Sequence, residues 1–493
     1  MPPPRPFERT AGARRSWTRS PALALASTGA VMAAVGWVGW TAGRRAAADR
    51  DAYLTARDTQ GAWPLALSFF AAGLGAWILF TPAEVGATVG VVGVVGYAVA
   101  AGLPFIALAW LGPLIRARVP AGVTLTDWVR LRFGRPMQAY VAVVSVFYMF
   151  IFMTAELTAV GGVVGLLTGA AERSLLWLAP IALVALVTTA YTVYGGLPAS
   201  LRTDRFQAWL ILAIVPLAAY GILRGVDDPA AAMRSSGLMA STGAGWSAFL
   251  VLCIAVAAAN LFHQGYWQRS WAAVDRRTLV RGAVGGALLT LPVMVLIGLT
   301  GILARGAGAV ADPAVDPGAP VSIAFFSLLT SAPPWLVGVI IALSVALVAS
   351  SVDTLENALA ATFAADVTGG RLSLAQARWM TLALTLPAVG LALANLSVLQ
   401  LFLAADLLAA ATVVPVFLGL DARTDRRAAL AGAVAGLVGV VALGVVRDGT
   451  LAAGQRLLVV QTGPAGLDLG AFVVAPVVAG VVTVVGSWAA GRR

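Results

Sequence analysis

The chain has 493 residues, of which 60% are hydrophobic and only 11% are charged, and its mean hydropathy is +0.88. This composition excludes an ordinary soluble domain and indicates a protein that crosses a membrane many times. The net charge of +11 comes from arginines, which lie mostly in short loops between apolar runs, as the positive-inside rule predicts. We therefore expect a lipid bilayer as surroundings, no nucleic-acid partner and no evident protein partner.

The apolar runs predict about thirteen transmembrane helices of about 18–25 residues each. Residues 1–20 predict a disordered basic tail, and residues 21–42 predict an extra N-terminal transmembrane helix. The other spans are expected at 63–82, 87–112, 138–168, 175–196, 206–224, 246–268, 279–304, 334–366, 376–396, 398–420, 428–446 and 470–489. A short amphipathic helix is expected around 321–329. The expected fold class is all-α integral membrane.

The stretch 344–366, SVALVASSVDTLENALAATFAAD, has membrane-spanning length but many polar groups. At 100° per residue, Ser350, Asp353, Thr354 and Asn357 fall within an arc of roughly 100°. A carboxylate at the bilayer centre costs ~2.5–3.5 kcal/mol, so such a stripe faces a protein interior or a watered cavity. The stripe indicates either a transport path or a set of hydrogen bonds between helices.

Further polar side chains lie inside apolar spans. Trp77 stands beside a Gly-rich interruption, and Glu156, Glu356 and Asp406 place carboxyl groups in three spans. Buried carboxylates need cations, protons or hydrogen-bond donors. We assign Glu156 and Asp406 to the wall of a substrate pocket, with structural hydrogen bonding as the alternative. Asp353 and Glu356 could also pair with an arginine near the end of a span.

Short stretches of this chain resemble the sodium:solute symporter family, in that family's order. They are DAYLTARDTQGAWPLALSFFAAGLGAW at 51–77, YTVYGGLPASLRTDRFQ at 191–207, HQGYWQR at 263–269 and ASSVDT at 349–354. The most specific is the second, which is close to the family pattern YTxxGGLxAxxxTDxxQ. The resemblance covers roughly residues 50–420.

The resemblance implies the leucine-transporter-type fold, with substrate and Na⁺ near the midplane between broken first and sixth core helices. It implies two inverted repeats of five helices, at 60–224 and 245–420, and two additional C-terminal transmembrane helices within 421–493. The sequence has interruptions at matching places of the two halves. They are AAGLG at 71–75 with Thr81-Pro82, and Asn260 with Gly265. Glycine at such places can also serve close helix packing.

The resemblance also implies a sodium site, because Na⁺ needs several oxygens to replace its water. The matching ligands are the backbone oxygens of Ala71, Leu74 and Leu347 and the hydroxyls of Ser350 and Ser351. The alternative for the serine pair is local bonding to the carbonyls of the preceding turn. Sodium is expected as the coupling ion and no cofactor is expected.

Asp204, in the TD pair of the second motif, resembles the acidic residue that lines the inner cation exit in the family. Its alternative is a loop salt bridge with Arg202 or Arg205. His263, the only histidine, and Gln264 match positions that present polar groups to substrate, and Tyr266 matches an inner aromatic gate. His263 could instead be a satisfied capping group, and Tyr266 and Trp267 could instead belong to an interfacial aromatic belt.

The predicted substrate-binding residues are therefore Trp77, Glu156, His263, Gln264, Tyr266, Asp353 and Asp406. The span at 87–112 supplies few polar side chains, which disfavours a sugar because its buried hydroxyls would lack partners. Urea, a polyamine, proline or another amino acid fits better.

We expect a sodium-coupled secondary active symporter that imports such a solute by alternating access, in the plasma (inner) membrane. The alternatives are a proton-coupled carrier, a Na⁺-independent facilitator and a transporter-like sensor. An enzyme is not expected, because the sequence has no metal cluster, nucleophile elbow or phosphate loop.

Overall fold

The structure is a computed structural model that describes residues 21–491 apart from 47–49, 314, 317, 331, 368–372, 395–397 and 460–466. The predicted tail at 1–20 lies outside the described residues. The regular elements of the described part are helices, as the composition predicted. A single bridge pairs Gln60 with Ala273.

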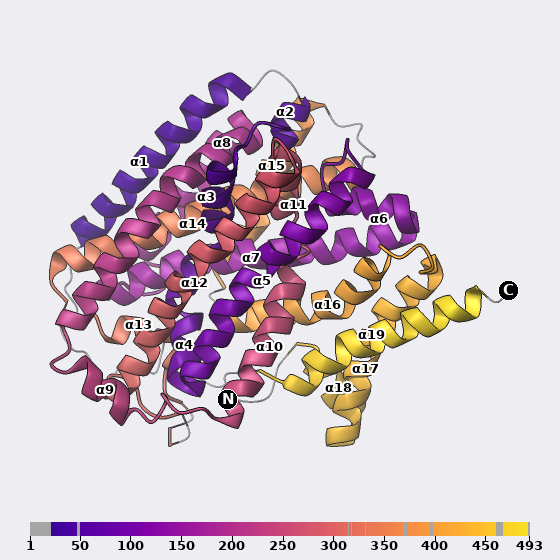
Figure 1. The fold of residues 1–493 in the computed structure, drawn as a ribbon. Helices are drawn as coiled ribbons and strands as arrows, with labels where there is room; N and C mark the ends of the chain where they lie inside the picture. Colours follow the sequence, from indigo (N-terminus) through magenta and orange to yellow (C-terminus); the bar gives the residue numbers. More distant parts are fainter. Residues whose placement is uncertain are drawn as a thin grey trace.

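The N-terminal half runs from α1 to α9 (Figure 1). Its helices are α1 Pro21–Ala46, α2 Arg50–Thr55, α3 Ala62–Gly73, η2 Ala76–Leu79, α4 Thr81–Val89, α5 Val91–Arg118, α6 Leu125–Phe133, α7 Arg135–Thr168, α8 Leu175–Arg224 and α9 Pro229–Ser235. The C-terminal half comprises α10 Gly243–Asn260, α11 Gln264–Ala272, α12 Arg276–Gly306, η3 Val321–Ile323, α13 Ala324–Ser327, α14 Pro334–Thr362, η4 Phe363–Val367, α15 Leu374–Ala392, α16 Val398–Leu418, α17 Arg426–Asp448, α18 Leu451–Leu457 and α19 Leu469–Ala490.

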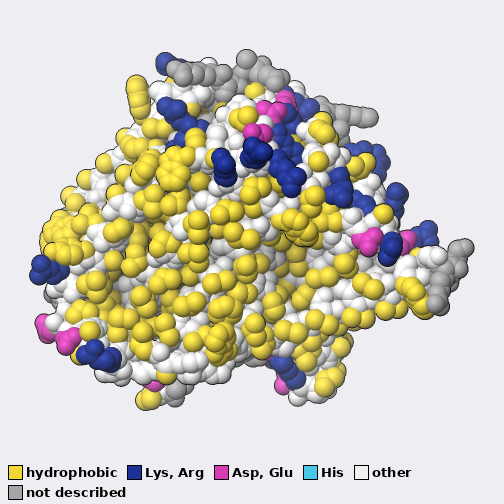
Figure 2. Space-filling model, viewed as in Figure 1, with side chains coloured by type: hydrophobic (Ala, Val, Ile, Leu, Met, Phe, Trp, Pro, Cys, Tyr) yellow, Lys and Arg dark blue, Asp and Glu magenta, His cyan; other side chains and the backbone are white. Residues whose placement is uncertain are grey.

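Nine described helices are long and apolar enough to cross a membrane, or ten if one bent pair counts as a span. That pair, 62–73 with 76–89, bends by 59°. Figure 2 shows a broadly apolar face with arginine side chains gathered toward the end that carries α2 and α6. The positive-inside rule places that arginine-rich end, called the inner end below, on the cytoplasmic side.

Nearly every residue of α14 from 336 to 362 is buried, which places this helix at the centre of the bundle. It packs against α7, α8 and α1, while α17 and α19 form a separate pair at the edge of the molecule (Figure 1). The polar stripe of 344–366 therefore faces protein, as the cost of exposing it to lipid requires.

Both expected helix breaks are present. Helix α3 ends at Gly73, a short 3-10 turn follows, and α4 begins at Thr81 with Pro82 in its first turn. Helix α10 ends at Asn260 and α11 begins at Gln264. Proline and glycine account for the first break, since proline lacks an N–H and is tolerated in a helix mainly within the first turn.

Several boundaries differ from the sequence expectation. The element α8 contains the two spans expected at 175–196 and 206–224 as two helices, which meet at a kink where Gly196 has φ +59° and ψ −150°. Tyr53 packs so closely there that a side chain at position 196 would overlap it, so glycine is required. The first core span does not end at 82, because α4 continues to Val89. The short helix α2 lies between the first span and the first core span.

Candidate functional site

A buried ion pair joins four helices beneath the first break. The guanidinium of Arg269, on α11, lies 2.7 Å from the carboxylate of Asp204, on α8, and neither side chain is exposed. Ser68 on α3 donates a hydrogen bond to the same carboxylate, and Ser350 on α14 donates one at 2.7 Å. Arg269 also donates to Ser68, Gly265 and Thr354. Every charge in this cluster is therefore paired, as burial demands.

The alternative pairing of Asp204 with Arg202 or Arg205 is wrong. Arg205 donates instead to Gln60 on the segment that follows α2. Asp204 points into the bundle because it lies on the buried face of α8, whereas Arg202 is exposed. Its role along an ion path stays a prediction.

The two predicted sodium-binding hydroxyls lie on the buried face of α14. Ser350 donates its hydrogen to Asp204, which leaves the lone pairs of its oxygen free. Ser351 is 1% exposed, and its hydroxyl has no hydrogen-bond partner among the described residues. The alternative of local bonding to the preceding turn therefore fails for Ser350. Ala71 and Leu74 lie at the end of α3, which contacts α14.

Asp353 faces α8 and has a complete set of hydroxyl partners. Tyr191 and Thr203 donate to one carboxylate oxygen at 2.6 Å and 2.8 Å, and Ser200 donates to the other at 2.8 Å. The sequence also allowed Asp353 to pair with an arginine, and no arginine among the described residues does so. These three hydroxyl partners come from α8, and the hydroxyl of Thr354 on α14 lies 3.4 Å from the second oxygen, so this carboxylate ties α14 to α8.

A cluster of aromatic rings joins the two helix breaks. Trp77 stacks on Tyr97, with ring centroids 5.7 Å apart, and also packs edge-on against Phe402. Phe402 contacts Phe152, whose ring lies 5.7 Å from that of His263. Side chains from η2, α5, α7 and α16 thus meet the second break.

His263, beyond the end of α10, is fully buried and stacked on Tyr266 at 4.1 Å with an interplanar angle of 6°. Within the described part of the chain, neither ring nitrogen has a hydrogen-bond partner, and the same holds for the indole nitrogen of Trp77. The capping alternative for His263 is wrong, since its side chain caps no helix N-terminus. Buried polar atoms without partners cost about 1–3 kcal/mol each and mark places where a ligand or water can bind.

Glu156 reaches the first break from α7. One carboxyl oxygen accepts a hydrogen bond from the backbone nitrogen of Ala76 at 2.8 Å, and the other has no partner in the described structure. The carboxyl group can approach because residue 75 is glycine, where a Cβ would overlap all three carboxyl atoms. Asp406 on α16 is 6% exposed and close enough to Tyr97 and Tyr148 to interact electrostatically with both.

The side chains of the remaining predicted residues make contacts within the helix bundle. The side chain of Gln264 donates to Ser145 at 2.7 Å and accepts from the backbone of Leu125 at 2.8 Å, so it joins α11 to α7 and α6. Tyr266 and Trp267 are buried within the bundle, which excludes the interfacial aromatic belt. The indole of Trp267 donates to the carbonyl of Leu261 at 2.7 Å.

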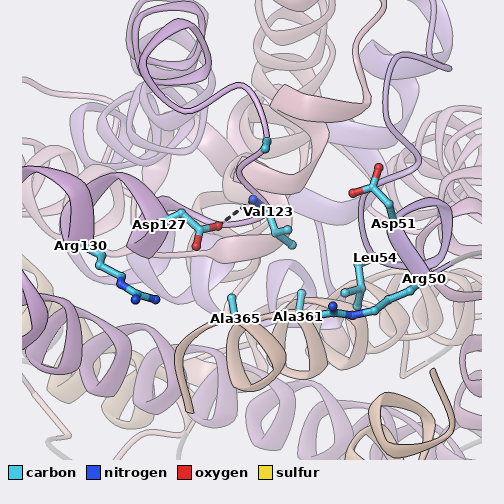
Figure 3. A pocket seen from close by; sticks show the side chains of 9 residues that line it. Arg50, Asp51, Leu54, Val123, Asp127, Arg130, Ala361 and Ala365 are labelled. Carbon is cyan, nitrogen blue, oxygen red and sulfur yellow. Dashed lines mark hydrogen bonds between the residues drawn. The ribbon is translucent and has the colours of Figure 1, made fainter. Parts of the chain in front are cut away.

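At the inner end, residues 50–60, called the inner latch below, cover the bundle. Arg57 pairs with Asp51 and also donates to the carbonyls of Pro120 and Gly122 at 2.7 Å and 3.1 Å. The hydrogen bonds from Arg57 hold the pKa of Asp51 below its usual range. A cavity of about 290 Å³ lies beside the latch, between α2, α6 and the inner end of α14 (Figure 3). Arg50, Asp51, Asp127 and Arg130 line it above Ala361 and Ala365.

Sequence reasoning missed two groups of residues. Arg269 was noticed only as part of a motif, although an arginine so close to a broken apolar span is itself a signal for a buried ion pair. Tyr97, Tyr148, Phe152 and Phe402 were missed because aromatic residues in apolar spans carry no signal that separates a pocket wall from ordinary core.

The fold defines a class of protein. A Na⁺-coupled sialic acid symporter, solved in a substrate-bound outward-open state, aligns with a TM-score of 0.75 over 94% of this chain and 97% of its own, at 15% identity. Mhp1, a nucleobase-cation-symport-1 family transporter in a closed conformation, aligns with a TM-score of 0.58, and MhsT, in complex with L-phenylalanine, aligns with a TM-score of 0.56, both at 16% identity. These alignments cover 89% and 86% of this chain and 95% and 98% of theirs. The chain therefore has the all-helical leucine-transporter-type fold, with several helices that could cross a membrane.

The chain belongs to the sodium:solute symporter family, whose model matches residues 53–438. The spermidine transporter DUR31 of Candida albicans is 32% identical over 443 residues, which cover 87% of this chain and 83% of that protein. Sodium/glucose cotransporter 2 of Rattus norvegicus is 33% identical over 155 residues, only 31% of this chain and 22% of that protein. This chain is therefore a solute transporter.

Proposed function

We propose that this chain is a sodium-coupled symporter that imports a small organic cation, of which a polyamine is the best candidate. The observation that carries the proposal is the set of buried polar atoms without partners between the two helix breaks. They belong to Glu156, His263 and Trp77, and aromatic rings surround them. A solute that binds there meets a carboxyl group, ring nitrogens and aromatic faces.

This chemistry favours an ammonium group over the other solutes. Glu156 and Asp406 bring two buried carboxyl groups to the aromatic cluster, and no arginine is bonded to either among the described residues. An ammonium held over an aromatic face gains about 0.5–2 kcal/mol, most when it is desolvated. The likeness to a spermidine transporter over most of both chains supports a polyamine among the cations.

The sodium site would lie beside the ion pair of Asp204 and Arg269. Ser350 already gives its hydrogen to Asp204, so its oxygen can still bind a cation, and the hydroxyl of Ser351 is unused in the described structure. The backbone oxygens of Ala71, Leu74 and Leu347 would complete the five ligands. The carbonyl of Ala71 accepts a hydrogen bond from the backbone of Leu74 at 3.3 Å, which leaves its oxygen a second lone pair for a cation.

The sodium gradient would supply the driving force. One Na⁺ that moves inward through 100 mV releases ~2.3 kcal/mol, and a tenfold concentration gradient adds ~1.4 kcal/mol. A cationic solute gains a further ~2.3 kcal/mol per charge from the same potential. Alternating access would rest on two inverted repeats of five helices within thirteen spans, in which α8 contributes two spans on either side of Gly196.

A thermal-stability screen of the purified protein tests the solute and the coupling together. Spermidine, putrescine, urea, proline and glucose are each added in sodium chloride and in choline chloride. A ligand at 100 times its dissociation constant stabilises the folded state by ~2.7 kcal/mol. We expect spermidine to raise the melting temperature, and to do so much more in sodium chloride.

Two variants sharpen that experiment. Glu156→Gln should abolish the shift caused by spermidine, whereas Glu172→Gln, in the connection between α7 and α8, should preserve it. A spermidine shift of equal size in both salts would instead indicate a Na⁺-independent facilitator. A shift caused only by urea or proline would refute the cation.

A further inference from the structure

Glu356 is a buried carboxyl group that belongs neither to the sodium site nor to the aromatic cluster. It lies on α14, one turn beyond Asp353, and is 1% exposed. Three threonines of α8 and α15 surround one of its oxygens. Thr189 lies 2.6 Å away, Thr385 3.0 Å and Thr188 3.5 Å. Its other oxygen has no hydrogen-bond partner in the described part of the chain.

Each of these hydroxyls has only one hydrogen to give. The hydroxyl of Thr188 lies 2.9 Å from the carbonyl of Val184, and that of Thr385 lies 3.0 Å from the carbonyl of Thr381. Bonds of this kind to the preceding turn are usual for threonine in a helix. If both hydrogens go there, only Thr189 donates to Glu356. Thr385 can then accept a hydrogen, but only a protonated carboxyl group has one to give.

The charged groups around Glu356 also favour a protonated carboxyl group. The titratable and charged groups on the elements that face it are Tyr191 on α8, Asp353 on α14, Arg378 on α15 and Tyr53 on α2. Arg378 donates to the carbonyl of Tyr194 and lies over the ring of Tyr53, 5.7 Å from its centroid. Asp353 brings a second carboxyl group close by. An ionised Glu356 would therefore be a buried charge without a bonded cation, which costs several kcal/mol.

The inner latch closes the path from Glu356 to the inner end. The hydroxyl of Tyr53 donates to the carbonyl of Thr192, one turn inward of Thr188 and Thr189. The same side chain packs with Ala361, Ala364 and Ala377, about one to two turns inward of Glu356 and Thr385. Tyr53 and these alanines therefore lie between Glu356 and the inner end.

We propose that Glu356 is a proton-binding site of the transport cycle, filled while the inner latch is closed and emptied toward the inner side when Tyr53 leaves Thr192. The O–H bond of the carboxylic acid breaks and the proton passes to inner water. After the inner latch has closed again, outer water protonates the carboxylate, so each cycle carries one proton inward. No electron transfer is involved. The proposal rests on the proposed transport cycle, but the proton itself can be observed without transport.

Infrared spectroscopy of the purified protein at neutral pH tests the proton directly. Protonated carboxyl groups give a C=O stretching band that carboxylates lack. We expect Glu356→Gln to reduce this band by one carboxyl group, Glu356→Asp to keep it, and the control Glu172→Gln to leave it unchanged. An unchanged band in Glu356→Gln would overturn the proposal.

Release is measured in proteoliposomes that contain a pH-sensitive dye and are given a sodium gradient and spermidine. We expect wild-type uptake to acidify the interior, and Glu356→Gln to take up spermidine without acidification. Acidification that survives in Glu356→Gln would overturn the proposal. If Glu356→Gln does not fold, wild-type uptake without acidification would also overturn it. Absence of wild-type uptake refutes the symporter instead, and the infrared band then decides the proton site alone.

Discussion

Gly75→Ala tests most directly how the first helix break holds the carboxyl group of Glu156, which we propose binds the solute. Gly75 has φ −108° and ψ −178°, an extended conformation that alanine adopts without strain. The added methyl group would overlap the carboxyl of Glu156, so the effect is a displaced side chain and not a distorted backbone. The substitution therefore acts on one contact.

The expected magnitude follows from what that contact contains. Glu156 loses its hydrogen bond from Ala76, worth about 1.5–3 kcal/mol if the carboxyl is charged. Crowding in a packed interior costs a further ~1–3 kcal/mol. We therefore expect Gly75→Ala to lower the free energy of unfolding by about 2.5–6 kcal/mol. The substitution should also weaken spermidine binding, because the displaced carboxyl group of Glu156 no longer faces the solute.

A double-mutant cycle isolates the clash. Binding and thermal unfolding are measured for Gly75→Ala, Glu156→Ala and the double variant, because neighbouring residues that share a contact give non-additive effects. The double variant should unfold no more easily than Glu156→Ala alone. Gly61→Ala serves as a control, since the nearest atom to its added Cβ is 3.8 Å away. Wild-type affinity in Gly75→Ala, or additive effects in the double variant, would refute the reasoning.

Two further predictions concern the ion pair and the sodium site. Asp204→Asn should lower the free energy of unfolding by about 3–5 kcal/mol, because Arg269 is left as a buried charge without its partner. Denaturant unfolding measures this free energy, and a loss below about 1 kcal/mol would contradict the prediction. Ser351→Ala should raise the sodium concentration for half-maximal spermidine uptake at least about tenfold, the effect of ~1.4 kcal/mol. Ser344→Ala is the control and should leave that sodium concentration unchanged, since the described partner of the Ser344 hydroxyl is the carbonyl of Ile341 in its own helix. If both substitutions changed the sodium concentration equally, the proposed sodium site would be contradicted.

The sequence predicted the broken helices because their causes are local. Gly73 and Pro82 interrupt the first core helix, and Asn260 precedes the second interruption. The resemblance to the family implied both breaks, and these residue types agreed with it. The sequence also predicted the polar stripe of α14, since a period of 3.6 residues puts Ser350 and Asp353 on neighbouring parts of one helix face. Hydropathy and motif order indicated the family, which the match over residues 53–438 confirms.

The partners of the buried charges were decided only by the tertiary structure. Arg202 and Arg205 flank Asp204 in the sequence, yet Arg269, 65 residues away, is its partner. Helix α8 turns Asp204 inward, and the break before Gln264 brings α11 beneath it. Glu356 likewise obtains its threonine shell from two other helices. Local sequence sets where a helix begins, ends and carries polar groups. Which charges meet depends on how distant helices pack, because a buried charge must find its partner across the bundle.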